Sequence, residues 1–198
     1  MMQFVETIRV ENGVPQHLAA HSERLRKTAA LHFGVDLHIS VDDIQVPENL
    51  KENLLKCRIL YSDSIEKFEF SVYEKRQIET LKVLHDNDID YTYKSSDRED
   101  LNRLFQQRNS ADEIIIVKNG WVTDSSFSNL LFEDEEGVLF TPSTFLLNGI
   151  QRKRLLEKKR VQESPISEAD ILRYSKIHLI NAMLSPGDLV VEINKVFF

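Results

Sequence analysis

ADEIIIVKNGWVTDSSFSNLLF, residues 111–132, is the stretch with the strongest fold signal in this chain. It predicts a strand, a tight turn at Asn119-Gly120 and the start of a second strand, because Asn-Gly between apolar runs is typical of hairpin loops. The next stretch, NLLFEDEEGVLFTP at 129–142, repeats the arrangement with Gly137 at the turn. We therefore expect antiparallel hairpins to dominate this part of the chain.

Helices and further strands are expected around these hairpins. The residues that follow Gly149 predict a helix up to residue 160, and a capped short helix is expected at 167–175. Strands are predicted at 176–184 and at 188–198. Upstream, 77–93 is interpreted as a connector, and a helix over 97–108 is expected to be capped by Ser96 or Asp97.

The N-terminal part predicts a smaller unit. A hairpin that turns at Asn12-Gly13 is followed by a helical pattern over 17–33, which Gly34 is placed to end. Three shorter elements are expected next: a helix within 44–56, after Pro47, and strands of period two at 57–62 and 66–74. The expected fold is α+β, with a small N-terminal domain at 1–88 and a larger, antiparallel β-rich domain with helices at 89–198.

Composition narrows the class of protein. The chain has 198 residues, 41% of them hydrophobic and 29% charged, which is ordinary for a globular protein. A net charge of −7 works against nucleic-acid binding, and no apolar run approaches the roughly 18 residues of a membrane span. The single cysteine, Cys57, fits a reducing compartment, so we expect a cytoplasmic protein. Six scattered histidines without a tight ligand pair make a metal centre improbable.

Three residues occupy positions at which chemistry is often found. Lys94 ends a predicted strand, Asp124 begins a turn and Gly149 precedes a helix. Each residue also has a common structural explanation. A lysine at a strand end is usually solvated, an aspartate often belongs to a turn, and a glycine before a helix often only meets a conformational requirement of the backbone. Their order along the chain carries the information.

That order resembles the class IV aminotransferases, which share the pyridoxal-phosphate fold of D-amino-acid and branched-chain aminotransferases and of 4-amino-4-deoxychorismate lyase. The 111–132 stretch is the most specific part, with DE at its start, G-x-V-T-[DE] at the turn and an Asn five residues after the acid. The other matching segments are FVETIRVENG (4–13), HSERL (21–25), YKSSDREDLNRL (93–104), TPSTFLLNGIQRKRLL (141–156) and HLINAM (178–183). The resemblance implies a two-domain fold like that of D-amino-acid aminotransferase, with substrate loops trimmed because this chain is shorter than typical members.

The resemblance also implies the central chemistry. Lys94 would form the Schiff base with pyridoxal 5′-phosphate and then move a proton on the substrate. Asp124, where the family more often has Glu, would keep the pyridine nitrogen protonated. Asn129 is expected to shape the turn after Asp124, on the cofactor side of the site. Glu99 stands where some aminotransferases place a tyrosine for the cofactor phenolate.

Further positions match the family's phosphate side. Arg24 matches an arginine that can grip phosphate oxygens with two N–H groups. The helix start at Ile150 and Gln151 offers main-chain N–H groups to an anion, although the family often has Thr in place of Gln151. Asn181 and Ala182 match the second turn on this side.

Substrate residues are expected on the first strand. Val5, Thr7 and Arg9 share one face by alternation, and in this family that face looks into the pocket. Arg9 is therefore a candidate anchor for a substrate carboxylate, and Arg58 matches a second pocket arginine of some relatives. For both arginines, exposure to solvent is an equally good reading.

Three functions remain open at this point. The first is an aminotransferase that acts on a small amino acid or amine and an oxo-acid, and the second is 4-amino-4-deoxychorismate lyase, which releases pyruvate and 4-aminobenzoate. The third is a catalytically silent binding module of the same fold. The resemblance further implies a homodimer, since relatives build each pocket at a subunit interface.

Overall fold

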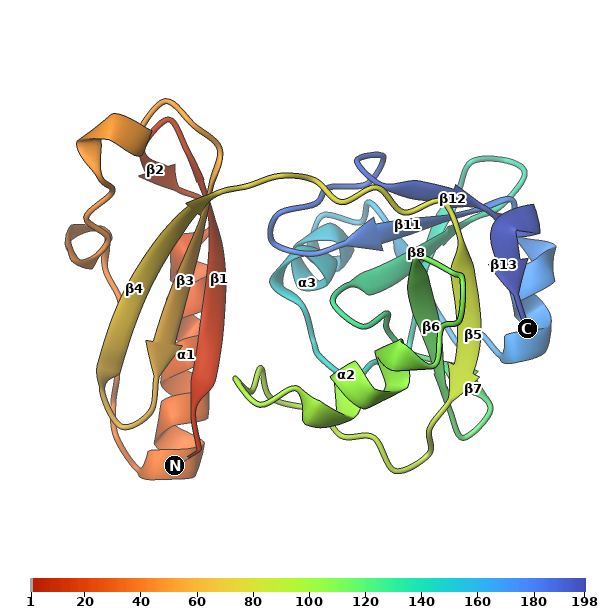
Figure 1. The fold of residues 1–198 in the computed structure, drawn as a ribbon, viewed down its shortest axis with the longest axis horizontal. Helices are drawn as coiled ribbons and strands as arrows, with labels where there is room; N and C mark the ends of the chain where they lie inside the picture. Colours follow the sequence, from red (N-terminus) through yellow and green to blue (C-terminus); the bar gives the residue numbers. More distant parts are fainter. Residues whose placement is uncertain (1) are drawn as a thin grey trace. The chain divides into compact units, whose positions relative to one another are not determined.

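Figure 1 shows the computed structural model of the protein, which describes residues 2–198. The chain forms two compact units. Unit 1 consists of residues 2–75 and Tyr93–Asp97, and unit 2 consists of Arg76–Thr92 and Arg98–Phe198. The predicted boundary after residue 88 falls inside the first segment of unit 2. No helix within residues 2–198 has both the length and the apolar character needed to cross a membrane.

Unit 1 is an antiparallel sheet with a helix, α1, against one face (Figure 1). The strands lie in the order β2-β1-β3-β4, with bounds β1 Phe4–Glu11, β2 Val14–Pro15, β3 Leu55–Tyr61 and β4 Ile65–Val72. Asn12 and Gly13 have φ angles of 49° and 76°, the left-handed values that the hairpin turn requires, so this predicted hairpin is confirmed. The predicted first helix is also confirmed: α1 spans Leu18–Phe33 and ends at Gly34, whose φ is 71°.

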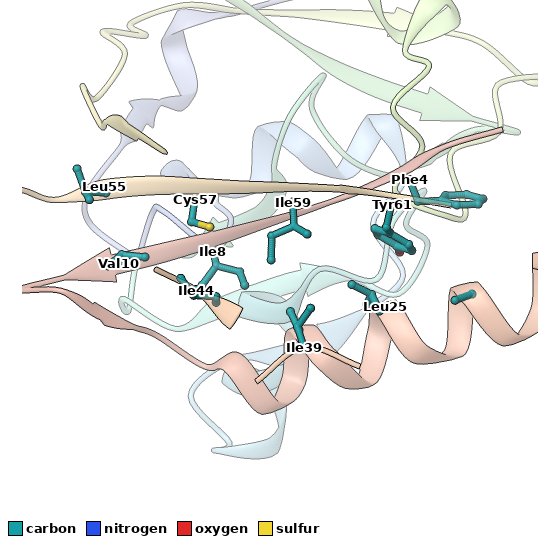
Figure 2. Close-up of a cluster of buried hydrophobic side chains, with 11 residues drawn as sticks. Phe4, Ile8, Val10, Leu25, Ile39, Ile44, Leu55, Cys57, Ile59 and Tyr61 are labelled. Carbon is teal, nitrogen blue, oxygen red and sulfur yellow. The ribbon is translucent and has the colours of Figure 1, made fainter. Parts of the chain in front are cut away.

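The core of unit 1 lies between the sheet and α1 (Figure 2). Because side chains alternate along a strand, one face of β1 and β3 supplies the apolar side chains that meet Leu25 of α1. Its buried members are Phe4, Ile8, Val10, Leu25, Ala29, Ile39, Ile44, Leu55, Cys57, Ile59 and Tyr61. The same alternation places Thr7, Arg9 and Arg58 on the opposite face of the sheet.

The segment between α1 and β3 has less helix than the sequence predicts. It contains two single 3-10 turns, η1 Val41–Asp43 and η2 Glu48–Leu50, and η2 is all that forms of the helix expected within 44–56. Leu55 is already part of β3, where it pairs with Val10 and is fully buried. Pairing in the sheet therefore ends any helix before it could extend.

Unit 2 is built on a five-stranded and a four-stranded sheet. The first has the order β10-β9-β8-β11-β12, with bounds β8 Asn129–Glu133, β9 Leu139–Pro142, β10 Gln162–Ser164, β11 Lys176–Ile180 and β12 Val190–Glu192. The second has the order β13-β5-β6-β7, with bounds β5 Leu81–His85, β6 Glu113–Lys118, β7 Trp121–Val122 and β13 Val196–Phe197. The helical elements are α2 Glu99–Gln106, α3 Ile150–Glu157, and the 3-10 helices η3 Glu168–Arg173 and η4 Ile193–Lys195.

The predicted hairpins of unit 2 are confirmed, and so are the helices at α2 and α3. Asn119 and Gly120 have φ angles of 52° and 81° at the turn between β6 and β7. Arg98, rather than Ser96 or Asp97, occupies the N-cap of α2. The capped helix expected at 167–175 forms as η3, with Ser167 and Asp170 capping each other's backbone.

Parallel pairs are the main difference from the sequence-based expectation. The connector interpretation of 77–93 is wrong at β5, which pairs in parallel with β6. β10 pairs in parallel with β9, and β13 with β5. The strand expected at 188–198 is divided by η4 into β12 and β13, which join different sheets. The partner of each parallel strand is distant in sequence, so its local pattern does not reveal the pairing.

Candidate functional site

Asp124 follows β7 and is only 5% exposed. Its Oδ1 accepts a hydrogen bond from Asn129 Nδ2 at 2.8 Å, and its Oδ2 accepts the backbone N–H groups of Leu146 and Leu147 at 3.2 and 2.9 Å. Burial raises the pKa of this carboxyl to about 6, against the effect of these donors, which favour the ionised form. Asp124 is therefore a buried acid with a raised pKa, a property frequent at functional sites.

Asn129 connects Asp124 to the start of α3. Its Nδ2 also donates to the Leu147 carbonyl at 2.9 Å. A Cβ built on Gly149 would overlap Oδ1 of Asn129 and lie 3.3 Å from its Cγ. Because the φ of Gly149 is −68°, which any residue can adopt, glycine is needed here for space and not for conformation.

The first turn of α3 has the properties of an anion site. No side chain within residues 2–198 caps its N-terminus, and the turn carries no acidic residue. The first N–H groups of a helix have no partner inside the helix and favour negative charge. Ile150 and Gln151 are buried there, and Gln151 Nε2 donates to Ser185 Oγ at 3.4 Å.

Ser185 lies just beyond the turn that begins at Asn181. Asn181 Oδ1 accepts the backbone N–H groups of Met183 and Leu184 at 2.8 and 3.1 Å. Its Nδ2 donates to the carbonyl of Phe127, in the loop between Asp124 and Asn129, at 3.5 Å. Contacts within unit 2 thus connect the segments that carry five predicted site residues: Asp124, Asn129, Ile150, Gln151 and Asn181. The sixth, Ala182, follows Asn181 in the same turn.

Two buried charges next to this group were not singled out from the sequence. Arg152 is 3% exposed, its guanidinium lies 4.4 Å from the centre of the Phe145 ring, and its charge favours ionised Asp124. Glu113 is fully buried, and its Oε1 accepts the Ser126 N–H at 3.1 Å. Arg152 lies in the segment TPSTFLLNGIQRKRLL (141–156), and Glu113 is the second residue of the DE pair at the start of the 111–132 stretch. The match of these segments to the family was the available signal.

Lys94 lies in unit 1, in the segment Tyr93–Asp97. Its carbonyl accepts the Val5 N–H at 2.9 Å, and the adjacent Ser95 forms an isolated β-bridge with Phe4. Lys94 itself is half-buried. The backbone of Lys94 is therefore fixed to the start of β1.

Arg24 lies on α1 and pairs with Glu6 of β1. Its Nε and Nη2 donate to the two carboxylate oxygens of Glu6 at 2.7 and 2.6 Å, and His21 Nδ1 lies 2.7 Å from the same carboxylate. Burial by itself would raise the pKa of Glu6, but Arg24 and His21 hold it at about 2. The sequence contains one indication of this contact: Glu6 is an acid at one of the alternating positions of β1 that are otherwise apolar and face the core. A buried acid needs a hydrogen-bonding or charged partner.

The three predicted substrate residues share the face of the unit 1 sheet that is opposite α1. Thr7 and Arg58 are register partners on β1 and β3, and Arg9 lies on the same face of β1. Arg58 Nη1 donates to Glu69 at 2.7 Å, and Arg9 Nε donates to Glu11 at 2.8 Å. Both arginines are therefore ion-paired with acidic neighbours and partly exposed.

The predicted site residues thus form two groups. Thr7, Arg9, Arg24, Arg58 and Lys94 lie in unit 1. The other six, which are Asp124, Asn129, Ile150, Gln151, Asn181 and Ala182, lie in unit 2. That the two groups form one site stays a prediction.

Known proteins are similar to this chain over most of its length. The family model described as amino-transferase class IV matches residues 3–186. A Haemophilus influenzae protein described as uncharacterized is 37% identical over 186 residues, which cover 92% of this chain and 98% of that protein. A proposed 4-amino-4-deoxychorismate lyase from Haemophilus somnus has a crystal structure with a TM-score of 0.79 and 33% identity, covering 92% of this chain and 97% of that chain. D-alanine aminotransferase of Bacillus licheniformis is 27% identical, covering 77% of this chain and 63% of that protein.

Proposed function

Because this chain belongs to the class IV aminotransferase family and has its α+β fold, we propose that it is a pyridoxal-phosphate-dependent aminotransferase. Its substrate would be a small amino acid or amine, which would take the place of the Lys94 amino group on the cofactor. The observation that carries this proposal is the group in unit 2 in which a buried carboxylate, Asp124, is joined through Asn129 to the uncapped start of α3.

The residues of that group fit the cofactor. A carboxylate shielded from water is a suitable partner for a protonated ring nitrogen, and Asp124 is in that environment. The start of α3 offers N–H groups to a phosphate, without a competing acid in its first turn. When bound, pyridoxal phosphate supplies an aldehyde and a ring that draws electrons from the substrate α-carbon.

The chain's own residues would then divide the work. Lys94 would hold the cofactor through its ε-amino nitrogen and, after the substrate amine displaces it, move the proton away from the substrate α-carbon. Asp124 would keep the proton on the ring nitrogen. The phosphate would be bound by Arg24, Ile150, Gln151, Asn181 and Ala182. A substrate carboxylate would be oriented by Thr7, Arg9 and Arg58.

Reduction with borohydride tests the role of Lys94. We expect the purified protein to take up pyridoxal phosphate and to carry it on Lys94 after reduction, as peptide mass spectrometry would show. Lys94→Ala should lose this label, whereas Lys153→Ala, a change at a surface lysine of α3, should keep it. A label on another lysine would refute the proposed site, and a protein that takes up no cofactor would favour the silent binding module.

The similarity to the Haemophilus somnus protein favours a second candidate, 4-amino-4-deoxychorismate lyase. Both reactions use the same lysine and cofactor, so their products must separate them. Conversion of the cofactor to its pyridoxamine form by an amino acid supports the aminotransferase. Release of pyruvate and 4-aminobenzoate from aminodeoxychorismate, without that conversion, supports the lyase.

We also infer a homodimer, as the family resemblance implies. Sedimentation of the protein at several concentrations tests this inference. A monomer that keeps full activity would refute it. The single cysteine, Cys57, is buried and unpaired, which fits a cytoplasmic location.

A further inference from the structure

Glu6 is a fully buried carboxylate between β1 and α1, and the proposed reaction does not use it directly. Its backbone is held in the middle of the sheet, where Glu6 pairs with Ile59 of β3. Its side chain points to α1 and receives Arg24 on both oxygens and His21 on one. The carboxylate is thus fixed by the strand on one side and by two cationic or polar donors on the other.

The contact engages one edge of the Arg24 guanidinium. A guanidinium has five N–H donors in a rigid plane, and Glu6 takes one on Nε and one on Nη2. The donors of Nη1 lie outside this contact and point along other directions of the same plane. The Arg24 side chain is 18% exposed, while those of Glu6 and His21 are 0% and 1% exposed, so the buried edge of the guanidinium is the one that meets Glu6.

We infer that Glu6 is a positioning residue, which holds the Arg24 guanidinium in a fixed orientation from which its outer edge binds the cofactor phosphate. This inference rests on the proposed function and names a residue that acts through Arg24 without touching the cofactor. A long arginine side chain otherwise loses considerable rotamer freedom when it binds an anion. The Glu6 contact removes that freedom before the phosphate arrives.

Glu6→Gln tests the inference through cofactor affinity. Gln keeps the shape but removes the charge and one acceptor, so Arg24 loses its two-point contact. We expect pyridoxal phosphate to bind the variant about tenfold more weakly, the effect of one lost charge-assisted hydrogen bond. The affinity for 5-deoxypyridoxal, which lacks the phosphate, should not change.

Two comparisons separate positioning from a structural role. Glu11 is a partly exposed acid on the same strand, and it pairs with Arg9. Glu11→Gln should leave the affinities for pyridoxal phosphate and for 5-deoxypyridoxal unchanged. In an Arg24→Ala background, Glu6→Gln should have no further effect on pyridoxal phosphate affinity, because the group through which it acts is absent. Equal weakening of both ligands by Glu6→Gln, or unchanged or tighter binding of pyridoxal phosphate, overturns the inference.

Arg24→Lys provides a test that leaves the buried acid in place. Lysine keeps the positive charge but cannot form the two-point contact, so we expect it to bind pyridoxal phosphate nearly as weakly as Arg24→Ala. Full affinity in Arg24→Lys shows that charge alone is sufficient and overturns positioning. A wild-type protein that binds neither ligand refutes the proposed function itself, and this inference falls with it.

Discussion

Replacing Gly149 with alanine should destabilise the protein through a single steric conflict. A Cβ at this position overlaps Oδ1 of Asn129, so the Asn129 amide must turn away. That movement breaks the hydrogen bonds from Nδ2 to Asp124 Oδ1 and to the Leu147 carbonyl, at 2.8 and 2.9 Å. The backbone conformation at Gly149 is compatible with alanine, because its φ is −68°.

The size of the effect follows from these two bonds. Leaving a buried hydrogen-bonding group without its partner costs about 1–3 kcal/mol. Alanine in place of glycine returns about 0.4–1 kcal/mol by restricting the unfolded chain. For the two broken bonds together, less the alanine effect, we therefore expect Gly149→Ala to lower the free energy of unfolding by about 1–5 kcal/mol, or the melting temperature by roughly 2–20 °C.

A double-mutant cycle, measured by urea denaturation of the cofactor-free protein, tests the reasoning. In an Asn129→Ala background the obstructing atoms are gone, so Gly149→Ala should be neutral or stabilising by up to about 1 kcal/mol. Gly120→Ala is the control, because a Cβ there meets no described atom within 4 Å. Its φ of 81° should make alanine cost about 1–2 kcal/mol in either background. The same loss from Gly149→Ala in both backgrounds would refute the steric explanation.

Three further predictions concern other buried groups. The folded-state pKa of Asp124 is raised from 3.8 to about 6, so its contribution to stability is present below pH 4 and is lost as the pH rises through 6. Between pH 4 and 7, the wild type should therefore lose up to about 3 kcal/mol relative to Asp124→Asn, and parallel pH profiles in urea would contradict this. Arg152 donates hydrogen bonds to the Pro142 carbonyl and to Glu163 and packs on Phe145, so Arg152→Met should cost about 2 kcal/mol in thermal unfolding. Lys153→Met on the surface should change stability by less than about 0.5 kcal/mol, and equal effects would count against a structural role for Arg152. Burial raises the pKa of the Cys57 thiol to about 12, so a thiol reagent at pH 8 should label it only after unfolding, and rapid labelling of the native protein would show that the site is open.

The turns and the motif order could be predicted from the sequence because they depend on neighbours in the chain. Asn12-Gly13 and Asn119-Gly120 adopt left-handed φ angles that few other residue pairs accept. Each dipeptide by itself was therefore enough to predict a hairpin turn. Gly34 ends α1 for the same local reason. The order of the motifs around Asp124 indicated the family, which the match over residues 3–186 confirms.

The sequence did not reveal contacts between distant segments. β5 forms a strand because it pairs with β6, which lies about thirty residues further along the chain. The five residues of β5 do not by themselves indicate a parallel partner. Glu6 has its partners on α1, and the acid in an apolar phase could only suggest that some partner exists.

The sequence by itself determined the family, the hairpin turns and the identity of the candidate acid, lysine and arginine. Only the tertiary structure decided the environment of each group: that Asp124 is buried among three donors, that Gly149 has no room for a side chain, and that Arg24 is held by Glu6. The physical reason is range. Backbone preferences act between neighbouring residues, whereas desolvation, packing and charge pairing depend on which remote atoms surround a group after the chain has folded.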